Sequence, residues 1–222
     1  MKLYCDPIST TSRPVMLFIA EHHLAVELVH VDLMNGGNLD AEYLALNPNG
    51  IVPFLVDGDF GLGESAAILR YLAQKSGSAT YPADLKARAK VDEAVSWFSM
   101  QFHEYFCLFT CYPTMGVPHG LDPVLAQGLM AYGEEQSVRW LKVLDQHMLG
   151  GRAFVAGDHI SIADYLGISF VLLGEVAAVD FSPYPNIERW IARMKARPAF
   201  DRTFAGFHGL VSFIRSQSQI PA

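Results

Sequence analysis

Ser9, Thr10, Thr11 and Ser12 form a run of four hydroxyl side chains, followed directly by Arg13. The run lies between a stretch typical of a short strand and the start of an amphipathic helix. Because a helix start favours negative charge, a hydroxyl held there can donate a hydrogen bond to an anion. A ligand thiolate stabilised in this way would have a pKa below the usual value of about 8.5. The alternative is that one of these hydroxyls only caps the helix.

Pro53 interrupts an apolar run, Ile51 to Val56, that otherwise has the composition of a buried strand. A proline in a strand belongs at an edge, a bulge or a turn. Alternatively the Val52–Pro53 bond is cis, an isomer that is accessible before proline. In the cis case Val52 would present its N–H and C=O outward, and an extended peptide could pair with them. An edge-strand proline would need no ligand.

A helix pattern begins at Glu64 and Ser65, soon after this strand. Ser65 is expected to cap the helix, whose unpaired N–H groups make a carboxylate site. Glu64 can receive a ligand ammonium group. Together with Val52, these residues fit a ligand that has an α-amino acid at one end and a peptide in its middle.

The elements that position these residues follow the order β-α-β-α-β-β-α. Strands are expected at 2–5, 26–33, the Pro53 run and 60–62, and helices at 13–23, 40–47 and 64–77. Asp57-Gly58 signals a hairpin between the last two strands, and Gly77 ends the last helix. This order predicts a small α/β domain around a four-stranded sheet.

Beyond a linker-like segment at 76–85, apolar residues recur at helical spacing and no strand pattern persists. Helices are expected over 86–112, 124–148, 161–179 and 186–196, and Pro198 leads to a last short helix. Ser161 and Asp164 form a capping box, and Ile160 and Tyr165 are spaced for a hydrophobic staple across it. The predicted fold class is therefore an α/β N-terminal domain plus an all-α C-terminal domain.

The composition excludes several classes of function. A net charge of −7 argues against non-specific binding of nucleic acid, which needs a basic surface. No apolar run is long enough to cross a bilayer, and the first residues do not form a signal peptide. Three cysteines do not make a disulfide framework, so a reducing, cytoplasmic location is expected.

The cysteines are expected to be structural. Cys107 and Cys111 are four residues apart, but no second pair of Cys or His has a spacing that would complete a metal site. Cys5 lies within the first strand, before the turn, which argues against a nucleophilic role. No metal is expected.

Four blocks of the sequence carry a family resemblance. They are "LYCDPISTTSRPVMLFIAE", "NPNGIVPFLVDGDFGLGESAAILRYLA", "YPADLKARAKVDEAVSWF" and "FVAGDHISIADY". With these blocks the chain resembles the cytosolic glutathione transferases, above all the theta-like, serine-type members. The resemblance implies a homodimer in which each chain has three parts. These are a thioredoxin-like, glutathione-binding domain over 1–77, a linker over 78–86 and an all-helical domain over 87–222 that lines the electrophile pocket.

The resemblance also implies roles for individual residues. Ser9 is the catalytic hydroxyl that stabilises the thiolate of the co-substrate glutathione, with Thr10 and Ser12 as competitors for that role. Val52, before a cis Pro53, pairs with the cysteinyl backbone of glutathione. The γ-glutamyl end is held by Glu64 and Ser65, and Arg13 orders the serine turn.

One feature departs from the family pattern. Similar proteins often place a cation in the loop before Pro48 to hold the glycine carboxylate, but here the loop reads "NGGNLDAE". Asn35 and Asn38 offer only neutral amide donors, which are weaker than charged ones. Modest glutathione affinity is expected, unless His103 or Arg88 reaches over from the helical domain.

The second substrate is expected between the domains, with Phe106 and Tyr112 as pocket residues. The predicted function is glutathione transfer to a small hydrophobic electrophile. The alternatives are a glutathione-dependent dehalogenase or peroxidase on the same site, and a non-catalytic dimeric binding protein with the same fold.

Overall fold

The computed structural model describes residues 1–117, 120 and 122–218. The first part has the predicted order of elements, with one short 3₁₀ turn in addition. Its elements are β1 (Lys2–Cys5), α1 (Ser12–Glu21), β2 (Glu27–His30), η1 (Gly37–Leu39), α2 (Ala41–Leu46), β3 (Phe54–Asp57), β4 (Phe60–Leu62) and α3 (Ser65–Lys75). The four-stranded sheet has the order β2-β1-β3-β4. Strand β2 is parallel to β1, whereas the β1–β3 and β3–β4 pairs are antiparallel.

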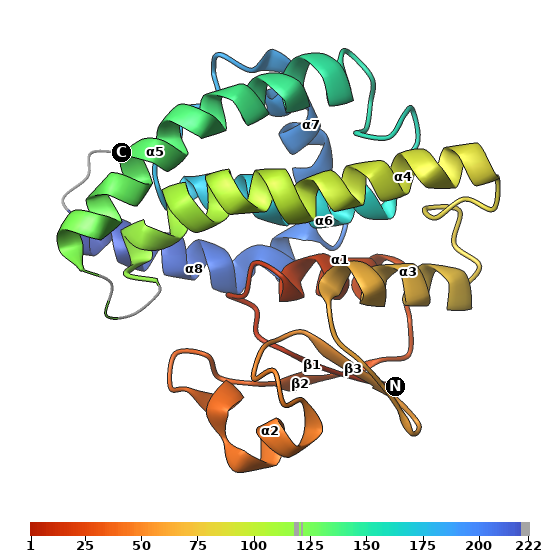
Figure 1. The fold of residues 1–222 in the computed structure, drawn as a ribbon. Coiled ribbons are helices and arrows are strands. Elements are labelled where there is room, and N and C mark those ends of the chain that lie inside the picture. The colour runs from red at the N-terminus through yellow and green to blue at the C-terminus, as the bar shows by residue number, and fades with distance from the viewer. Residues whose placement is uncertain (118–119, 121, 219–222) are drawn as a thin grey trace.

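The sheet of the first domain is covered on both faces, by α1 and α3 on one side and by α2 on the other (Figure 1). Leu3 and Cys5 are buried in the main core together with residues of α1 and α3. Tyr4 points to the opposite face, where it packs with Tyr43 of α2 and Val52. This is the period of two that a strand covered on both faces requires. The predicted hairpin is confirmed, with Asp57 opposite Phe60 and Gly58 at a φ of 65°.

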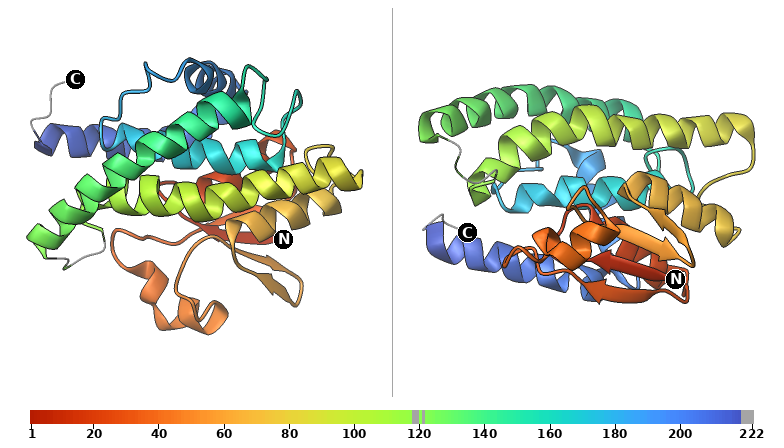
Figure 2. Two further views of the ribbon diagram at one scale, coloured as in Figure 1. Left: turned by 45° about the horizontal axis from the view of Figure 1, so that its top comes forward. Right: turned by 60° about the horizontal axis from the view of Figure 1, so that its bottom comes forward.

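The second part of the described chain is helical, as predicted, and Figure 2 shows it stacked on α1 and α3. Its elements are α4 (Leu85–Trp97), η2 (Phe98–Cys111), η3 (Tyr112–Met115), α5 (Pro123–Lys142), η4 (Val143–Leu149), α6 (Ile162–Leu172), η5 (Leu173–Glu175), α7 (Pro185–Lys195) and α8 (Phe200–Ser218). The segments η2 and η4 continue α4 and α5 with wider, π-type turns. None of the described helices is both long and apolar enough to cross a membrane.

Helix α6 is the central element of the molecule. All of its residues are buried, and it packs against α1 and α3 of the first domain and α4 of the second. The predicted capping box at its start is confirmed: Asp164 Oδ2 accepts from the N–H and the hydroxyl of Ser161, each at 2.9 Å. Asp164 Oδ1 accepts from Val155 N and from Trp190 Nε1, also at 2.9 Å. One buried carboxylate therefore joins α6, α7 and the preceding loop.

Two helix predictions were wrong in length. The expected helix 161–179 ends in η5 at Glu175, and Ala178 beyond it has a φ of 52°, which is incompatible with an α-helix. The expected short last helix is α8, with 19 residues. Phe200, Phe204, Phe207 and Val211 recur at helical spacing and are buried, so tertiary packing sustains this helix.

Candidate active site

The turn that holds the hydroxyl run is built on Asp6, directly after β1. Its carboxylate accepts from Ile8 N at 2.9 Å and from Leu33 N, beyond β2, at 3.0 Å. The carbonyl oxygen of Asp6 accepts from Ser9 N at 3.0 Å. Asp6 thereby fixes the path of the chain from the sheet to α1. The sequence analysis did not single out this residue.

Ser9 is 9% exposed and lies in a continuous chain of hydrogen bonds. Its Oγ accepts from Ser12 N at 3.1 Å and lies 3.1 Å from Thr11 Oγ1. Thr11 Oγ1 donates to the carbonyl oxygen of Val52 at 2.9 Å. Because threonine has one hydroxyl hydrogen, Ser9 must be the donor to Thr11. Thr11 thus joins Ser9 to Val52, a link that sequence reasoning missed.

The other two hydroxyls of the run point elsewhere. Ser12 is fully buried, and its Oγ accepts from Asp6 N at 3.4 Å. The side chain of Thr10 forms a hydrogen bond with Tyr112 of the helical domain. Ser9 is linked to Val52 through Thr11, whereas the side-chain hydrogen bonds of Ser12 and Thr10 lead to Asp6 and Tyr112.

The Val52–Pro53 bond is cis, so the edge-strand alternative is set aside. Strand β3 begins only at Phe54, after the proline. The preceding carbonyl, that of Ile51, accepts from Tyr43 Oη at 2.6 Å and from Asn47 Nδ2 at 2.8 Å. Val52 is buried. Its backbone is fixed by the hydrogen bonds to the Ile51 carbonyl on one side and by the Thr11 hydroxyl on its own carbonyl.

The expectation that Ser65 caps α3 was wrong. The helix begins at Ser65 itself, the cap position belongs to Glu64, and no side chain of the described residues makes a cap hydrogen bond there. Glu64 has φ 63° and ψ 114°, a conformation that costs a non-glycine residue roughly 1–3 kcal/mol. Its carbonyl still accepts from Ile68 N at 2.9 Å. The Glu64 side chain is exposed, whereas Ser65 is buried beside it.

Arg13 is fully buried beneath the serine turn. Its Nη1 donates to Ile8 O at 2.6 Å, and its guanidinium carbon lies 3.9 Å from the ring centroid of Phe207 on α8. Burial lowers the pKa of Arg13 to about 9, and its Nε has no hydrogen-bond partner in the described part of the chain. Arg13 therefore supports the serine turn by joining the Ile8 carbonyl to α8.

The two asparagines of the loop before Pro48 already have partners. Asn38 Nδ2 donates to Gly50 O at 2.7 Å, which ties the loop to the chain just before Ile51. Asn35 Nδ2 donates to Asp32 Oδ2 at 2.6 Å. Each amide keeps only one further hydrogen for a ligand, so neither is a strong carboxylate anchor.

Tyr112 and His103 are neighbouring polar side chains of the helical domain, and Tyr112 contacts the serine turn through Thr10. Burial raises the pKa of Tyr112 to about 12, so that its phenol stays protonated at neutral pH. His103 packs beside Tyr112 and Phe170, and burial lowers its pKa below the ordinary value.

Phe106, by contrast, is fully buried against Phe102, with ring centroids 4.7 Å apart, so the structure places it in the core and not on a pocket wall.

All three cysteines are free and buried. Burial raises the pKa of Cys5 to about 12 and holds the thiols of Cys107 and Cys111 above their ordinary range. Each therefore stays a protonated thiol, which is a poor nucleophile and a poor metal ligand. Among the residues that the structure describes, no three His, Cys, Asp or Glu side chains are grouped so as to hold a metal ion.

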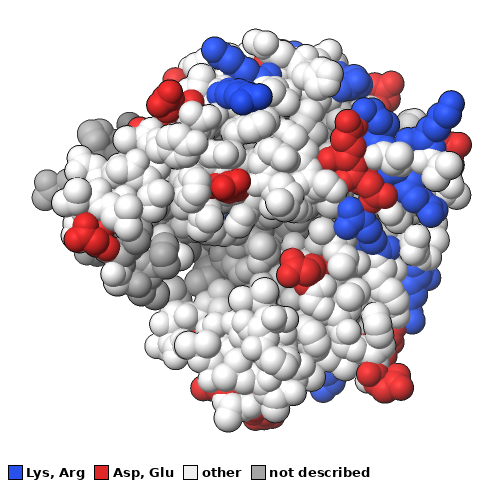
Figure 3. Space-filling model, in the orientation of Figure 1, with Lys and Arg blue, Asp and Glu red and all other residues white. Residues whose placement is uncertain are grey.

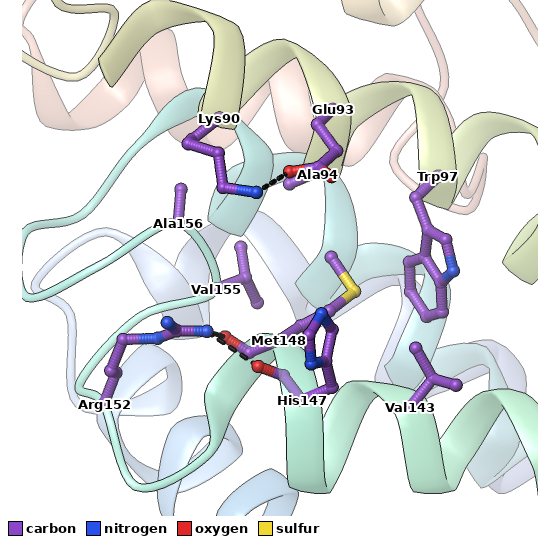
Figure 4. A pocket seen from close by; sticks show the side chains of 10 residues that line it. All are labelled: Lys90, Glu93, Ala94, Trp97, Val143, His147, Met148, Arg152, Val155 and Ala156. Carbon is purple, nitrogen blue, oxygen red and sulfur yellow. Dashed lines mark hydrogen bonds and ion pairs between the residues drawn. The ribbon is translucent and has the colours of Figure 1, made fainter. Parts of the chain in front are cut away.

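The surface is hollowed between the helical domain and the α/β domain (Figure 3), and the described atoms around the hollow are mainly uncharged. A separate pocket lies between α4, η4 and the loop before α6 (Figure 4). Trp97, Val143 and Met148 line its apolar side, and Lys90, His147 and Arg152 lie at its rim. The serine turn, Val52 and Glu64 do not contribute to it.

Comparison with known families identifies the chain. A family model of the glutathione S-transferase N-terminal domain matches residues 3–80, and the model of the C-terminal domain matches residues 127–198. The chain belongs to the glutathione S-transferase family. It is therefore a glutathione transferase, an enzyme, and glutathione is the co-substrate that its family uses.

Two similar curated proteins are glutathione S-transferases of the theta class. The chain is 36% identical over 201 residues to glutathione S-transferase theta-1 of Homo sapiens, covering 88% of this chain and 82% of that protein. It is 31% identical over 199 residues to theta-3 of Mus musculus, with the same coverage of both proteins. These likenesses confirm the predicted theta-like membership.

Solved structures confirm the fold of this transferase. The human T1-1 enzyme in its apo form matches with a TM-score of 0.84 and 30% identity, covering 99% of this chain and 91% of that one. Human theta-2 in complex with glutathione and an unknown ligand also has a TM-score of 0.84, at 27% identity, with 99% and 92% coverage. The thioredoxin-like domain followed by a helical domain is thus established.

Proposed function

We propose that this transferase holds glutathione against Val52, Glu64 and Ser65, with its sulfur beside the hydroxyl of Ser9. The observation that supports this most directly is the hydrogen-bond chain from Ser9 through Thr11 to Val52. It connects the thiolate donor to the backbone group that would pair with the cysteinyl residue. The start of α3, where the Glu64 backbone is strained, would receive the γ-glutamyl end.

The reaction would begin with loss of the thiol proton to solvent. The Ser9 hydroxyl and the start of α1 stabilise the thiolate, which lowers the thiol pKa from about 8.5. The thiolate then attacks an electrophilic carbon held in the hollow between the domains. In this proposal Tyr112, which keeps its proton at neutral pH, would line the helical side of the pocket. Either the leaving group departs with its electron pair or the attacked double bond is protonated.

Substitution of Ser9 tests this proposal. Ser9→Ala should lower turnover by about 10²-fold, the usual effect of losing one donor to a developing anion. Glutathione should still bind, because Val52 and Glu64 are untouched. Ser212→Ala, on the exposed face of α8, is the matched control and should behave as the unaltered enzyme. Turnover that is the same in Ser9→Ala would remove Ser9 from the mechanism.

Glutathione affinity is expected to be modest. The described loop before Pro48 contains no cation, and the Asn38 amide already donates a hydrogen bond to the carbonyl oxygen of Gly50. Isothermal titration should give a Kd of glutathione above about 1 μM. A sub-micromolar value would mean that a further group binds the glycine carboxylate.

The identity of the electrophile needs a substrate panel. Alkyl halides, hydroperoxides and activated aryl compounds distinguish a general transferase from a dehalogenase or a peroxidase on the same site. The mainly uncharged surface of the hollow favours small apolar compounds.

We also propose a homodimer in a reducing, cytoplasmic compartment. Exposed apolar side chains on η2 and α5, among them Met100, Leu108, Tyr132 and Val138, support an interface. The three free cysteines support the compartment. Sedimentation velocity would show a species of twice the chain mass if the dimer forms.

A further inference from the structure

The side chain of Thr11 contacts both Ser9 and Val52. Its Oγ1 lies 3.1 Å from Ser9 Oγ and 2.9 Å from the carbonyl oxygen of Val52. The Val52 carbonyl can only accept, so the single hydroxyl hydrogen of Thr11 is donated to it. The hydroxyl hydrogen of Ser9 is in turn donated to Thr11, and not toward a ligand.

Binding of glutathione would change which of these groups donates and which accepts. In the proposed function, on which this inference rests, the cysteinyl N–H of glutathione donates to the Val52 carbonyl. The Thr11 hydroxyl is then free to turn to its other neighbour, Ser9 Oγ, without losing a hydrogen bond. Ser9 Oγ would accept from both Ser12 N and Thr11 Oγ1, which uses both of its lone pairs. Its own hydrogen would be left for the sulfur.

We propose that Thr11 is a positioning residue that reverses the direction of this hydrogen-bond chain when glutathione binds. In the reversed chain two donors in series point at the sulfur, and each polarises the next. Ser9 then stabilises the thiolate more strongly than an isolated serine would. Occupation of Val52 by the peptide backbone is thereby coupled to ionisation of the thiol.

Two substitutions separate the hydroxyl of Thr11 from its shape. Thr11→Val has nearly the same volume but no hydroxyl, whereas Thr11→Ser keeps the hydroxyl. The readout is the ultraviolet absorbance of the thiolate of bound glutathione, recorded as a function of pH. In Thr11→Val the midpoint should rise by at least about half a pH unit, which corresponds to roughly threefold less thiolate at a fixed pH below the midpoint. In Thr11→Ser it should stay close to the original midpoint.

The Ser9→Ala background provides the control. If Thr11 acts through Ser9, adding Thr11→Val to Ser9→Ala should cause no further shift, because coupled residues are not additive. An unchanged or lower midpoint in Thr11→Val alone would overturn the inference, as would equal shifts in the Val and Ser variants. An unchanged midpoint in Ser9→Ala would instead overturn the proposed function itself.

Discussion

The hydroxyl of Ser169, in the middle of α6, donates a hydrogen bond of 2.6 Å to the carbonyl oxygen of Thr10 across the domain boundary. The carbonyl oxygen of Ser169 accepts from Arg13 Nη2 at 3.5 Å. One buried residue of the helical domain therefore holds the serine turn on both sides of Ser12. The serine turn of the first domain is thus shaped partly by the second.

Ser169→Ala tests this contact. The substitution leaves the Thr10 carbonyl without its partner in a buried place, which should lower the free energy of unfolding by about 1–3 kcal/mol. Turnover should fall as well, because Ser9 sits on the loosened turn. Urea denaturation and steady-state kinetics measure the two effects. Stability and turnover equal to those of Ser212→Ala would show that the contact is dispensable.

Asp164 should be among the residues most sensitive to substitution outside the active site. Asp164→Asn keeps the size but replaces one acceptor oxygen with an amide that faces two donors. The free energy of unfolding should fall by about 2–4 kcal/mol. Asp158→Asn, at an exposed position of the preceding loop, is the control for the change of charge. Denaturation midpoints that agree between the two variants would contradict this role.

Glu64 should matter for binding much more than for stability. Glu64→Gly relieves the strained backbone, since glycine tolerates positive φ, but it also makes the unfolded chain more flexible. These effects oppose each other, so the free energy of unfolding should change by less than about 1 kcal/mol. Glutathione affinity should fall by at least about tenfold, because the acceptor for the ammonium group is lost. Unaltered affinity by titration would remove Glu64 from the binding site.

His103 should make the stability depend on pH. Burial lowers its pKa in the folded protein, so below pH 6.5 the unfolded chain binds the proton more readily. The free energy of unfolding should therefore fall as the pH drops below about 6.5, by no more than about 1.4 kcal/mol per pH unit from this residue.

His103→Gln removes the titrating group, so its loss of stability between pH 7 and pH 5 should be smaller than that of the unaltered enzyme. His159→Gln, at an exposed position, is the matched control. Guanidinium denaturation at the two pH values measures the difference. Parallel losses in all three proteins would show that His103 does not contribute.

Local sequence signals predicted most of the fold. The short strand over 2–5 and the Asp57-Gly58 turn are signalled by neighbouring residues, and both appear in the structure. The Ser161–Asp164 capping box is also local, and it was found. The length of α8 was missed because glycine and serine lower its intrinsic helix propensity, whereas Phe204 and Phe207 stabilise it only through packing.

The geometry of the site was less accessible to sequence reasoning. Ser65 is a typical cap residue, but the chain places the unusual φ at the cap residue Glu64 and begins the helix at Ser65, one residue earlier than a serine cap would. Thr11 could not be distinguished from Thr10, because the direction of each hydroxyl depends on a turn anchored by the distant Leu33. The contacts of Ser169 and Tyr112 join residues more than a hundred positions apart.

The cation of Arg13 lies against Phe204 and Phe207 of α8, the last helix of the described chain. A ribosome completes residues 9–13 early in synthesis and α8 almost two hundred residues later. Until those two rings arrive, the guanidinium beneath Ser9 has no aromatic face to rest on. The serine turn is thus synthesised early, but its Arg13 can acquire these contacts with α8 only near the end of synthesis.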